Sequence, residues 1–361
     1  MKKQFVKILS LCVLGATTVF VSCDKNNDDE KPEVKNEKRV YILNEGSWNG
    51  NNSTLDVYYP DGENDYQSKI FAAANGQGLG DTGQDLLAYG DRIYVSVWGS
   101  NYLAKLDPKG KIVEKHEFTP EEGQPRYLAA KDGFIYVSTY GDAVLKFDTT
   151  SIAVSLGKVA VGSNPEGIAV AGNNLIVCNS QKDGAVDNRI SVIDLATFTL
   201  KKQIESAEFN NYQIACVVND SVYVTYYTPM YAIEMLNIDV EAGTIKHSGA
   251  ATKMVSYNEK LYCANSATVY DANWVPTTNT NFFVRDIKAG TDTEILDLTS
   301  TPEIKTASVY LFEIDPNNGD YYVGTTDSQT NGNIYRFDKD GNFIVKFETS
   351  GINPNHAAFL K

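Results

Sequence analysis

Histidine is scarce in this sequence of 361 residues, and common catalytic motifs are missing. Its three histidines are scattered along the chain, which argues against a histidine-based metal centre. The motifs GxSxG, CxxC and HExxH and a Walker phosphate loop are absent. We therefore expect that the protein is not an enzyme and that it holds no resident cofactor and no metal ion. The alternative that folding brings together an acid–base pair stays open.

An excess of positive charge is also missing. The chain has 32 lysines and arginines against 46 aspartates and glutamates, so its net charge is −14. Nucleic acids and anionic lipid surfaces attract basic proteins, and this composition argues against both as partners. Hydrophobic residues make up 42% of the chain, which is enough to bury a sizeable core.

No hydrophobic run is long enough to span a bilayer. The longest, residues 8–21, has 14 residues and follows three lysines, as in a secretory signal. It leads to Val21-Ser22-Cys23, which resembles a lipobox. We predict that residues 1–22 are a lipoprotein signal peptide and that Cys23 is lipidated. An ordinary secretory signal with a chance cysteine is the alternative.

Residues 23–38 read as an acidic, flexible tether because they lack aromatic side chains and include the stretch DKNNDDE. That stretch resembles the signal that sends lipoproteins of Bacteroidota to the outer face of the outer membrane. Removal of the signal peptide lowers the net charge from −14 to −17. We expect an acidic, soluble body that a lipid holds at the cell surface.

Cysteine contributes little else to the body of the chain. Cys178, Cys216 and Cys263 lie inside apolar runs, and their number is odd. They read as buried small hydrophobic residues rather than as a disulfide framework.

A short apolar pattern recurs along the body at steps of about 40–60 residues. Examples are RVYILNEG at 39–46, RIYVSVWG at 92–99 and FIYVSTYG at 134–141. Most copies follow another strand across a tight turn, and two alternating strands come after. This period is that of four-stranded propeller blades.

The leading strand of each unit falls near residues 85, 127, 167, 213, 253, 308 and 356. The first copy lacks a leading strand and the last leading strand lacks a partner, so the two ends complete one blade. The sequence thus predicts an all-β fold over residues 39–361. It is a seven-bladed β-propeller of four-stranded antiparallel blades, closed by the N- and C-terminal strands. A β-sandwich with a second domain is the alternative, but it leaves the seven copies unexplained.

Aromatic residues concentrate in segments expected on one face of this propeller. Connections after the second strand of each blade and connections that lead into the first strand share that face. Aromatic rings among amide side chains suit a large, partly apolar, neutral ligand. The alternative is that these rings brace neighbouring loops. The candidate contacts are Trp48, Trp98, Arg126, Tyr127, Tyr140, Tyr212, Tyr226, Tyr227 and Trp274.

Several stretches carry a family resemblance over residues 39–361: ILNEGSWNGNNSTLDVYYP, GLGDTGQDLLAYGDRIYVSV, PRYL, and the C-terminal PNNGDYYVGTTDSQTNGNIYRFDKDGNFIVKFETSGINP. Together they resemble the surface-layer-like, YncE-type propeller lipoproteins of Bacteroidota. The resemblance implies a surface lipoprotein that captures a scarce nutrient and works with a TonB-dependent outer-membrane transporter. Cobalamin is the ligand in one branch of that family and ferric enterobactin in another. The resemblance also implies that residues 44–48, Arg126 and Tyr127 lie at the ligand-binding rim of the propeller.

The sequence favours cobalamin between these two. A ferric siderophore is strongly anionic, whereas the candidate rim cations are only Arg126, Lys182, Arg285 and Lys305. A corrinoid is nearly neutral and fringed with amides, which asparagine and glutamine can pair with. Capture of a ferric siderophore, or a carbohydrate- or protein-binding surface module, remain the alternatives.

Overall fold

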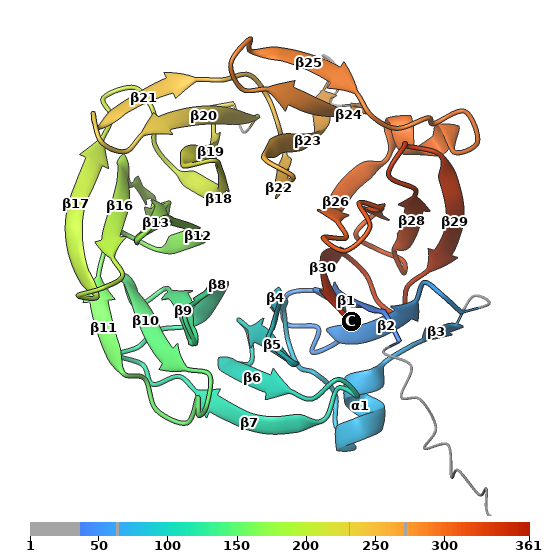
Figure 1. Cartoon of the computed structure of the whole chain (residues 1–361), viewed down its shortest axis with the longest axis horizontal. Coiled ribbons are helices and arrows are strands. Elements are labelled where there is room, and N and C mark those ends of the chain that lie inside the picture. The colour runs from blue at the N-terminus through green and yellow to red at the C-terminus, as the bar shows by residue number, and fades with distance from the viewer. Residues whose placement is uncertain (1–36, 63–64, 231, 271–272, 274) are drawn as a thin grey trace, which may run out of the picture. The chain divides into compact units, whose positions relative to one another are not determined.

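Seven four-stranded antiparallel sheets stand around a central axis, which confirms the predicted propeller (Figure 1). The computed structural model describes residues 37–62, 65–230, 232–270, 273 and 275–361. The predicted signal peptide, Cys23 and most of the predicted tether lie outside the described residues.

The first three blades run in chain order from the inner strand outward. Blade 1 consists of β4 (Gly83–Tyr89), β5 (Arg92–Val97), β6 (Tyr102–Leu106) and β7 (Ile112–Glu117). Blade 2 consists of β8 (Pro125–Lys131), β9 (Phe134–Thr139), β10 (Ala143–Asp148) and β11 (Gly157–Ala160). Blade 3 consists of β12 (Pro165–Ala171), β13 (Asn174–Asn179), β16 (Arg189–Asp194) and β17 (Thr199–Glu205).

The next three blades repeat this arrangement. Blade 4 consists of β18 (Tyr212–Val218), β19 (Ser221–Tyr227), β20 (Ile233–Asp239) and β21 (Thr244–His247). Blade 5 consists of β22 (Lys253–Tyr257), β23 (Lys260–Tyr270), β24 (Pro276–Asp286) and β25 (Thr291–Glu294). Blade 6 consists of β26 (Ser308–Ile314), β27 (Tyr321–Thr326), β28 (Asn333–Phe337) and β29 (Phe343–Glu348).

Blade 7 joins the two ends of the chain, and the remaining elements are short. Blade 7 consists of β30 (Pro354–Leu360), β1 (Arg39–Asn44), β2 (Thr54–Tyr59) and β3 (Asp65–Gln67). Outside the blades lie the hairpin β14 (Gln181–Lys182) and β15 (Ala185–Val186), the helix α1 (Ile70–Asn75) and the 3₁₀ helix η1 (Pro302–Thr306). Nowhere in the described chain is a helix both long and apolar enough to cross a bilayer.

Position in the blade explains the sequence pattern of each strand. A second strand such as β5 is buried along almost its whole length, because neighbouring blades cover both of its faces. An outer strand such as β7 alternates between buried and exposed positions, because one of its faces meets water. The recurring apolar pattern in the sequence is thus the second strand of each blade.

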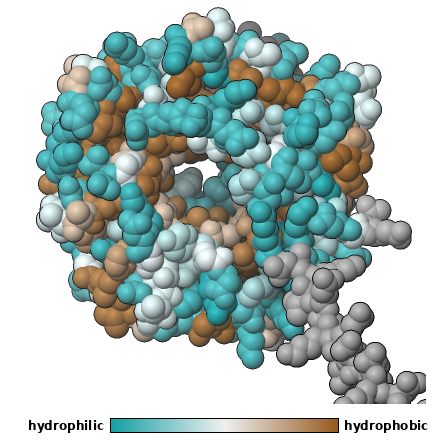
Figure 2. Space-filling view, in the orientation of Figure 1, coloured by the Kyte–Doolittle hydropathy of each residue, from teal (hydrophilic) through white to brown (hydrophobic). Residues whose placement is uncertain are grey.

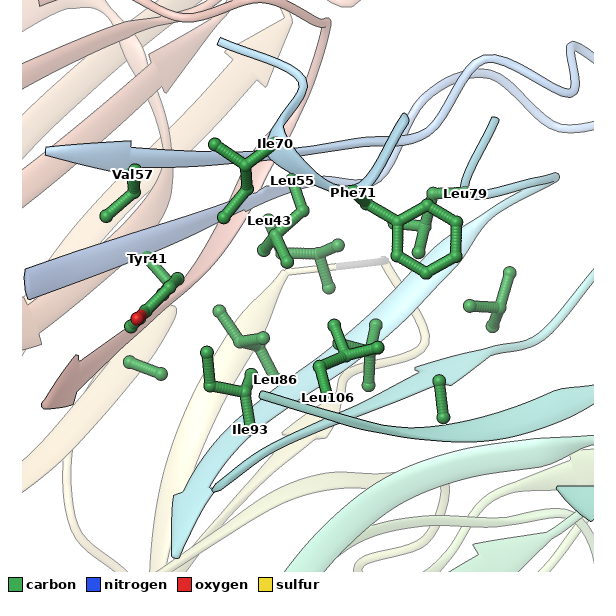
Figure 3. Close-up of a cluster of buried hydrophobic side chains, with 14 of the residues drawn as sticks. Tyr41, Leu43, Leu55, Val57, Ile70, Phe71, Leu79, Leu86, Ile93 and Leu106 are labelled. Carbon is green, nitrogen blue, oxygen red and sulfur yellow. The ribbon is translucent and has the colours of Figure 1, made fainter. Parts of the chain in front are cut away.

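One hydrophobic cluster fills each interface between neighbouring blades in the described structure. The cluster between blades 7 and 1 joins Tyr41, Leu43 and Leu55 to Ile93 and Leu106 (Figure 3). The three described cysteines are buried in such interfaces and form no disulfide, as predicted. Burial raises the pKa of the Cys216 and Cys263 thiols to about 12.

The tight turns predicted from sequence connect inner and second strands. Asn219 and Asp220 join β18 to β19 with φ values of 46° and 64°. Asn258 and Glu259 join β22 to β23 with φ values of 45° and 61°. Two consecutive positive φ angles are the requirement of a type I′ hairpin turn.

The ring closes where β1 pairs with β30, between the first and last strands of the body. The blue β1 and the red β30 lie side by side in Figure 1, as the half-blades at the two ends predicted. Because blade 7 contributes to two interfaces, this pairing completes both the last cluster and the first.

A buried carboxylate strengthens this closure. Asp56 on β2 is fully buried and has no ion-pair partner among the described residues. Its oxygens accept hydrogen bonds from the Asn44 amide at 2.7 Å, the Tyr66 hydroxyl at 2.6 Å and the Lys69 backbone N–H at 2.8 Å. Ser350 donates from its backbone N–H at 3.0 Å and its hydroxyl at 2.5 Å. Asp56 therefore ties the segment before β30 to the N-terminal strands.

We expect Asp56→Ala to lower the free energy of unfolding by about 3 kcal/mol or more, because it leaves several buried donors without an acceptor. Denaturant unfolding monitored by circular dichroism measures the effect. Asp61→Ala is the control, since Asp61 is exposed and, among the described residues, forms an ion pair with Lys38 alone. A loss no larger than that of the control would contradict the role of Asp56.

Candidate functional site

The starts of the inner strands lie together at one face of the ring: residues from the starts of β4, β8, β18, β22, β26 and β30 line one cavity, and Glu166 of β12 pairs with Arg126 there. We call this face the funnel face. The connections that follow the second strands reach the same face, because antiparallel neighbours alternate in direction. The two sets of loops that carry the predicted aromatic contacts therefore do meet on one side of the molecule.

A cavity of about 350 Å³, the funnel, opens where the inner strands begin. A second cavity of about 420 Å³, the lower chamber, lies beyond it along the inner strands. Figure 2 shows the hollow at the centre of the ring. We call the residues that line both cavities the throat: Tyr127, Ile214, Lys253, Asn355 and His356.

Irregular pairing at the starts of the inner strands shapes the funnel. The register shifts between Gly83 and Asp85 in β4 and between Pro125 and Leu128 in β8, and the other inner strands except β22 show comparable shifts. Such bulges re-aim side chains, so consecutive residues can face one cavity. The funnel side chains delivered at these shifts are Gln84, Arg126, Tyr127, Gln213, Tyr310 and Asn355.

Arg126 is the centre of a hydrogen-bonded polar group in the funnel. Its guanidinium donates to Glu166 Oε2 from Nε at 2.8 Å and from Nη2 at 2.6 Å, and also to the Gln84 side chain. The Tyr140 hydroxyl donates to the other oxygen of Glu166. Burial lowers the pKa of Arg126, but Glu166, Tyr140 and Tyr127 together outweigh this effect and raise the pKa overall.

Three aromatic rings surround the same guanidinium. The Arg126 Cζ atom lies 4.8 Å from the ring centre of Tyr140, 5.8 Å from that of Tyr127 and 5.9 Å from that of Trp98. Such cation–π contacts stabilise an arginine in a partly desolvated site. Arg126 is thus both neutralised and fixed in place.

A second charged group lies at the throat. His356 Nδ1 is 3.4 Å from Asp85 Oδ1 and 3.6 Å from Glu313 Oε1. Burial lowers the pKa of His356, but these two carboxylates outweigh it and raise the pKa above its ordinary value. Nearby, the Tyr310 hydroxyl donates to Glu45 Oε2 at 2.5 Å. Burial raises the pKa of Glu45 and also that of Asp85.

The structure gathers five of the predicted contacts around the funnel. Arg126, Tyr127 and Tyr227 line the cavity, while Trp98 and Tyr140 pack on Arg126. Trp48 lies on the loop after β1 at the funnel face and is 73% exposed, away from this cluster. Trp274 lies outside the described residues.

Two predicted contacts lie in the hydrophobic core instead. Tyr212 is fully buried between blades 3 and 4, and its hydroxyl donates to the Phe209 carbonyl at 2.9 Å. Tyr226 belongs to the same cluster and donates to Glu234 at 2.8 Å. The reason is the alternation of side chains in β19, which turns Tyr226 into the blade interface and Tyr227 toward the funnel.

Sequence reasoning did not single out Asp85, Glu166, Lys253, Tyr310 or Glu313 as site residues. Glu45 falls within the predicted rim segment 44–48 and lines the funnel. One signal was present: a proline one or two residues before a site residue recurs in Pro125-Arg126-Tyr127, Pro165-Glu166-Gly167 and Pro354-Asn355-His356. These triplets mark bulged starts of inner strands and point to Glu166 and His356. Lys253 comes from β22, which has no bulge, and no comparable signal marks it.

The other predicted rim cations are mostly paired. Lys182 contacts Asp142 at 2.6 Å, and Arg285 contacts Asp292 at 2.7 Å on the outer part of blade 5. Lys305 lies in η1 and lines a separate cavity. Within the described residues no group of three or more histidine, cysteine or acidic side chains has an arrangement that could hold a metal ion.

A family model described as a domain of unknown function, DUF5074, matches residues 38–357. The chain belongs to this family. No curated protein matches it. The narrower resemblance to YncE-type lipoproteins stays a prediction.

Solved structures show the same fold at low sequence identity. The WD40 β-propeller domain of Doa1 has a TM-score of 0.56 and 12% identity, over 81% of this chain and 87% of that chain. Hydrazine synthase of Kuenenia stuttgartiensis has a TM-score of 0.55 and 18% identity, over 72% and 77%. Apo AztD from Citrobacter koseri has a TM-score of 0.52 and 11% identity, over 90% and 98%. At these identities the likeness extends to the fold alone.

We expect Glu166→Gln to lower the free energy of unfolding by about 3 kcal/mol, because it leaves the Arg126 charge buried without its carboxylate. The double variant Arg126→Met/Glu166→Leu should recover most of that loss. Lys339→Met, which removes an exposed ion pair, is the control. Equal midpoints of urea unfolding for Glu166→Gln and the control would show that the Arg126–Glu166 pair contributes little.

Proposed function

We propose that this chain is a lipid-anchored protein on the outer face of the outer membrane that captures a large, nearly neutral nutrient. The preferred ligand is a corrinoid such as cobalamin, passed on to a TonB-dependent transporter. The observation that carries the ligand class is the composition of the funnel, where aromatic rings and amides surround Arg126, whose charge Glu166 already neutralises. The transporter and the cell-surface location rest on the sequence resemblance.

The charges around the channel favour a neutral ligand over an anionic one. Arg126, Lys253 and His356 are the cations, and Glu45, Asp85, Glu166 and Glu313 are the carboxylates that lie with them. Arg126 holds two hydrogen bonds to Glu166, so its charge is not free to compensate a strongly anionic ferric siderophore. Burial of further negative charge here carries a large desolvation cost.

The rim of the funnel face supplies apolar contacts. Among the most exposed large hydrophobic side chains are Trp48 at 73% and Met230 at 88%, and both lie on loops that follow second strands. Val186, Val269 and Val275 are exposed on the corresponding connections of blades 3 and 5. Exposed apolar groups around an amide-lined cavity suit a macrocycle with an apolar ring and a polar fringe.

Calorimetry on residues 37–361, which form a compact unit, tests the ligand. We expect cyanocobalamin to bind and ferric enterobactin to give little heat. Trp48→Ala and Trp98→Ala should each weaken cyanocobalamin binding about tenfold, or about 1.4 kcal/mol. Leu156→Ala is the control, because Leu156 is 60% exposed on the connection between β10 and β11, at the opposite face.

The outcomes separate the alternatives. Tight binding of ferric enterobactin alone would replace the corrinoid by a siderophore and keep the capture role. Binding of neither compound, with retention on a surface glycan, would favour a carbohydrate-binding module. Because the proposed role is binding without turnover, chromatography should recover cyanocobalamin unchanged; a converted product would indicate an enzyme.

Cys23→Ala tests the anchor. We expect the variant to lose its membrane association, whereas Cys12→Ala, inside the predicted signal, should remain in the membrane fraction. Protease added to intact cells should digest the wild-type protein if it faces outward. Protection in intact cells would instead place it on the periplasmic side.

A further inference from the structure

Lys253 is the one channel cation whose charge has no direct partner among the described residues. Its side chain lies at the throat, where it lines both the funnel and the lower chamber. Its ammonium nitrogen lies 5.0 Å from the ring centre of Tyr310. By contrast, Arg126 is paired with Glu166, and His356 lies beside Asp85 and Glu313.

Carboxylates with spare acceptor capacity lie around this ammonium group. Glu45 lines the funnel together with Lys253, and Asp85 and Glu313 line the lower chamber together with it. Glu45 accepts from Tyr310, and Glu313 lies 3.6 Å from His356 with 27% of its side chain exposed. Asp85 has fewer free lone pairs than Glu45 and Glu313, because it accepts hydrogen bonds from the backbone N–H groups of Leu86 and Leu128, both at 2.7 Å. Glu45 and Glu313 therefore keep free lone pairs near the Lys253 donors.

We propose that the throat binds a primary carboxamide of the ligand. The amide carbonyl accepts a hydrogen bond from the Lys253 ammonium group, and the amide N–H₂ donates to Glu313 or Glu45. Lys253 supplies a donor to both cavities, and Glu45 and Glu313 supply acceptors to the funnel and the lower chamber, so the throat offers both kinds of partner that a carboxamide needs. This site rests on the proposed function, because corrinoids carry carboxamides along their edge.

Other polar groups fit this throat less well. A carboxylate or phosphate would satisfy Lys253 but would face Glu313, Glu45 and Asp85 as like charges. An ammonium group would pair with the carboxylates but would repel Lys253 and His356. A carboxamide satisfies both kinds of partner and adds no net charge. Burial lowers the pKa of Lys253, which shows how little solvent compensates its charge.

Saturation-transfer NMR on the compact 37–361 unit, with propionamide, propionate and propylammonium as probes, tests the throat directly. We expect wild-type protein to give a propionamide signal at least fivefold stronger than that of either charged analogue. Lys253→Met should lower the propionamide signal at least fivefold. Lys305→Met, an exposed lysine outside the channel, should leave it unchanged.

A second variant keeps the test informative if Lys253→Met does not fold. Glu313→Gln removes one like charge, so it should raise the propionate signal relative to that of propionamide at least threefold. A purely structural role for Glu313 would lower both signals together. Equal signals for propionamide and propionate in the wild-type protein, or no effect of Lys253→Met in a folded variant, would overturn the carboxamide site.

The same probes separate this proposal from the proposed function. If propionamide binds through Lys253 but cyanocobalamin gives no heat, the throat site stands and the corrinoid ligand is wrong. If cyanocobalamin binds with equal affinity to wild-type protein and Lys253→Met, the corrinoid stands and the carboxamide site is wrong.

Discussion

The pairing of β1 with β30 is the constraint on which the rest of the structure depends. Without it the ring would keep two open sheet edges, and the clusters on both sides of blade 7 would lose one wall. Asp56 contributes to the same closure, since its carboxylate gathers donors from the N-terminal segment and from Ser350 near the C-terminus. The funnel exists only because this ring is complete: β30 supplies Asn355 and His356, and the loop after β1 supplies Glu45.

The site arises from small departures from regular strand pairing. A regular inner strand would send alternate residues into the two flanking blade interfaces, but the bulges present consecutive residues such as Arg126 and Tyr127 to the channel. The polar side chains that the bulges bring into the channel then pair across blades. Arg126 of blade 2, for example, donates hydrogen bonds to Glu166 of blade 3 and Gln84 of blade 1. These contacts link three neighbouring blades at the mouth of the channel.

Much of the fold was predictable because each blade repeats the same burial. The apolar second strands, the positive-φ turns such as 219–220 and the unmatched strands at the two ends predict the propeller and its closure. Part of the site was predictable for the same reason: loops after second strands share a face, so Trp98 and Tyr140 meet at Arg126. The burial of Tyr212 was not predictable, because the local sequence pattern does not reveal which side of a strand the next blade covers.

By itself, the sequence determined the repeat, the strand order within each blade and the acidic, aromatic-rich character of the body. These depend on local periodicity and composition, which survive without knowledge of long-range contacts. Only the tertiary structure decided which charges neutralise each other: Arg126 pairs with Glu166 across 40 residues, and His356 lies beside Asp85, 271 residues away in the sequence. The tertiary structure also decided that Lys253 has no partner among the described residues. Lys253 lies between two cavities, and these cavities form only where seven blades meet around one axis.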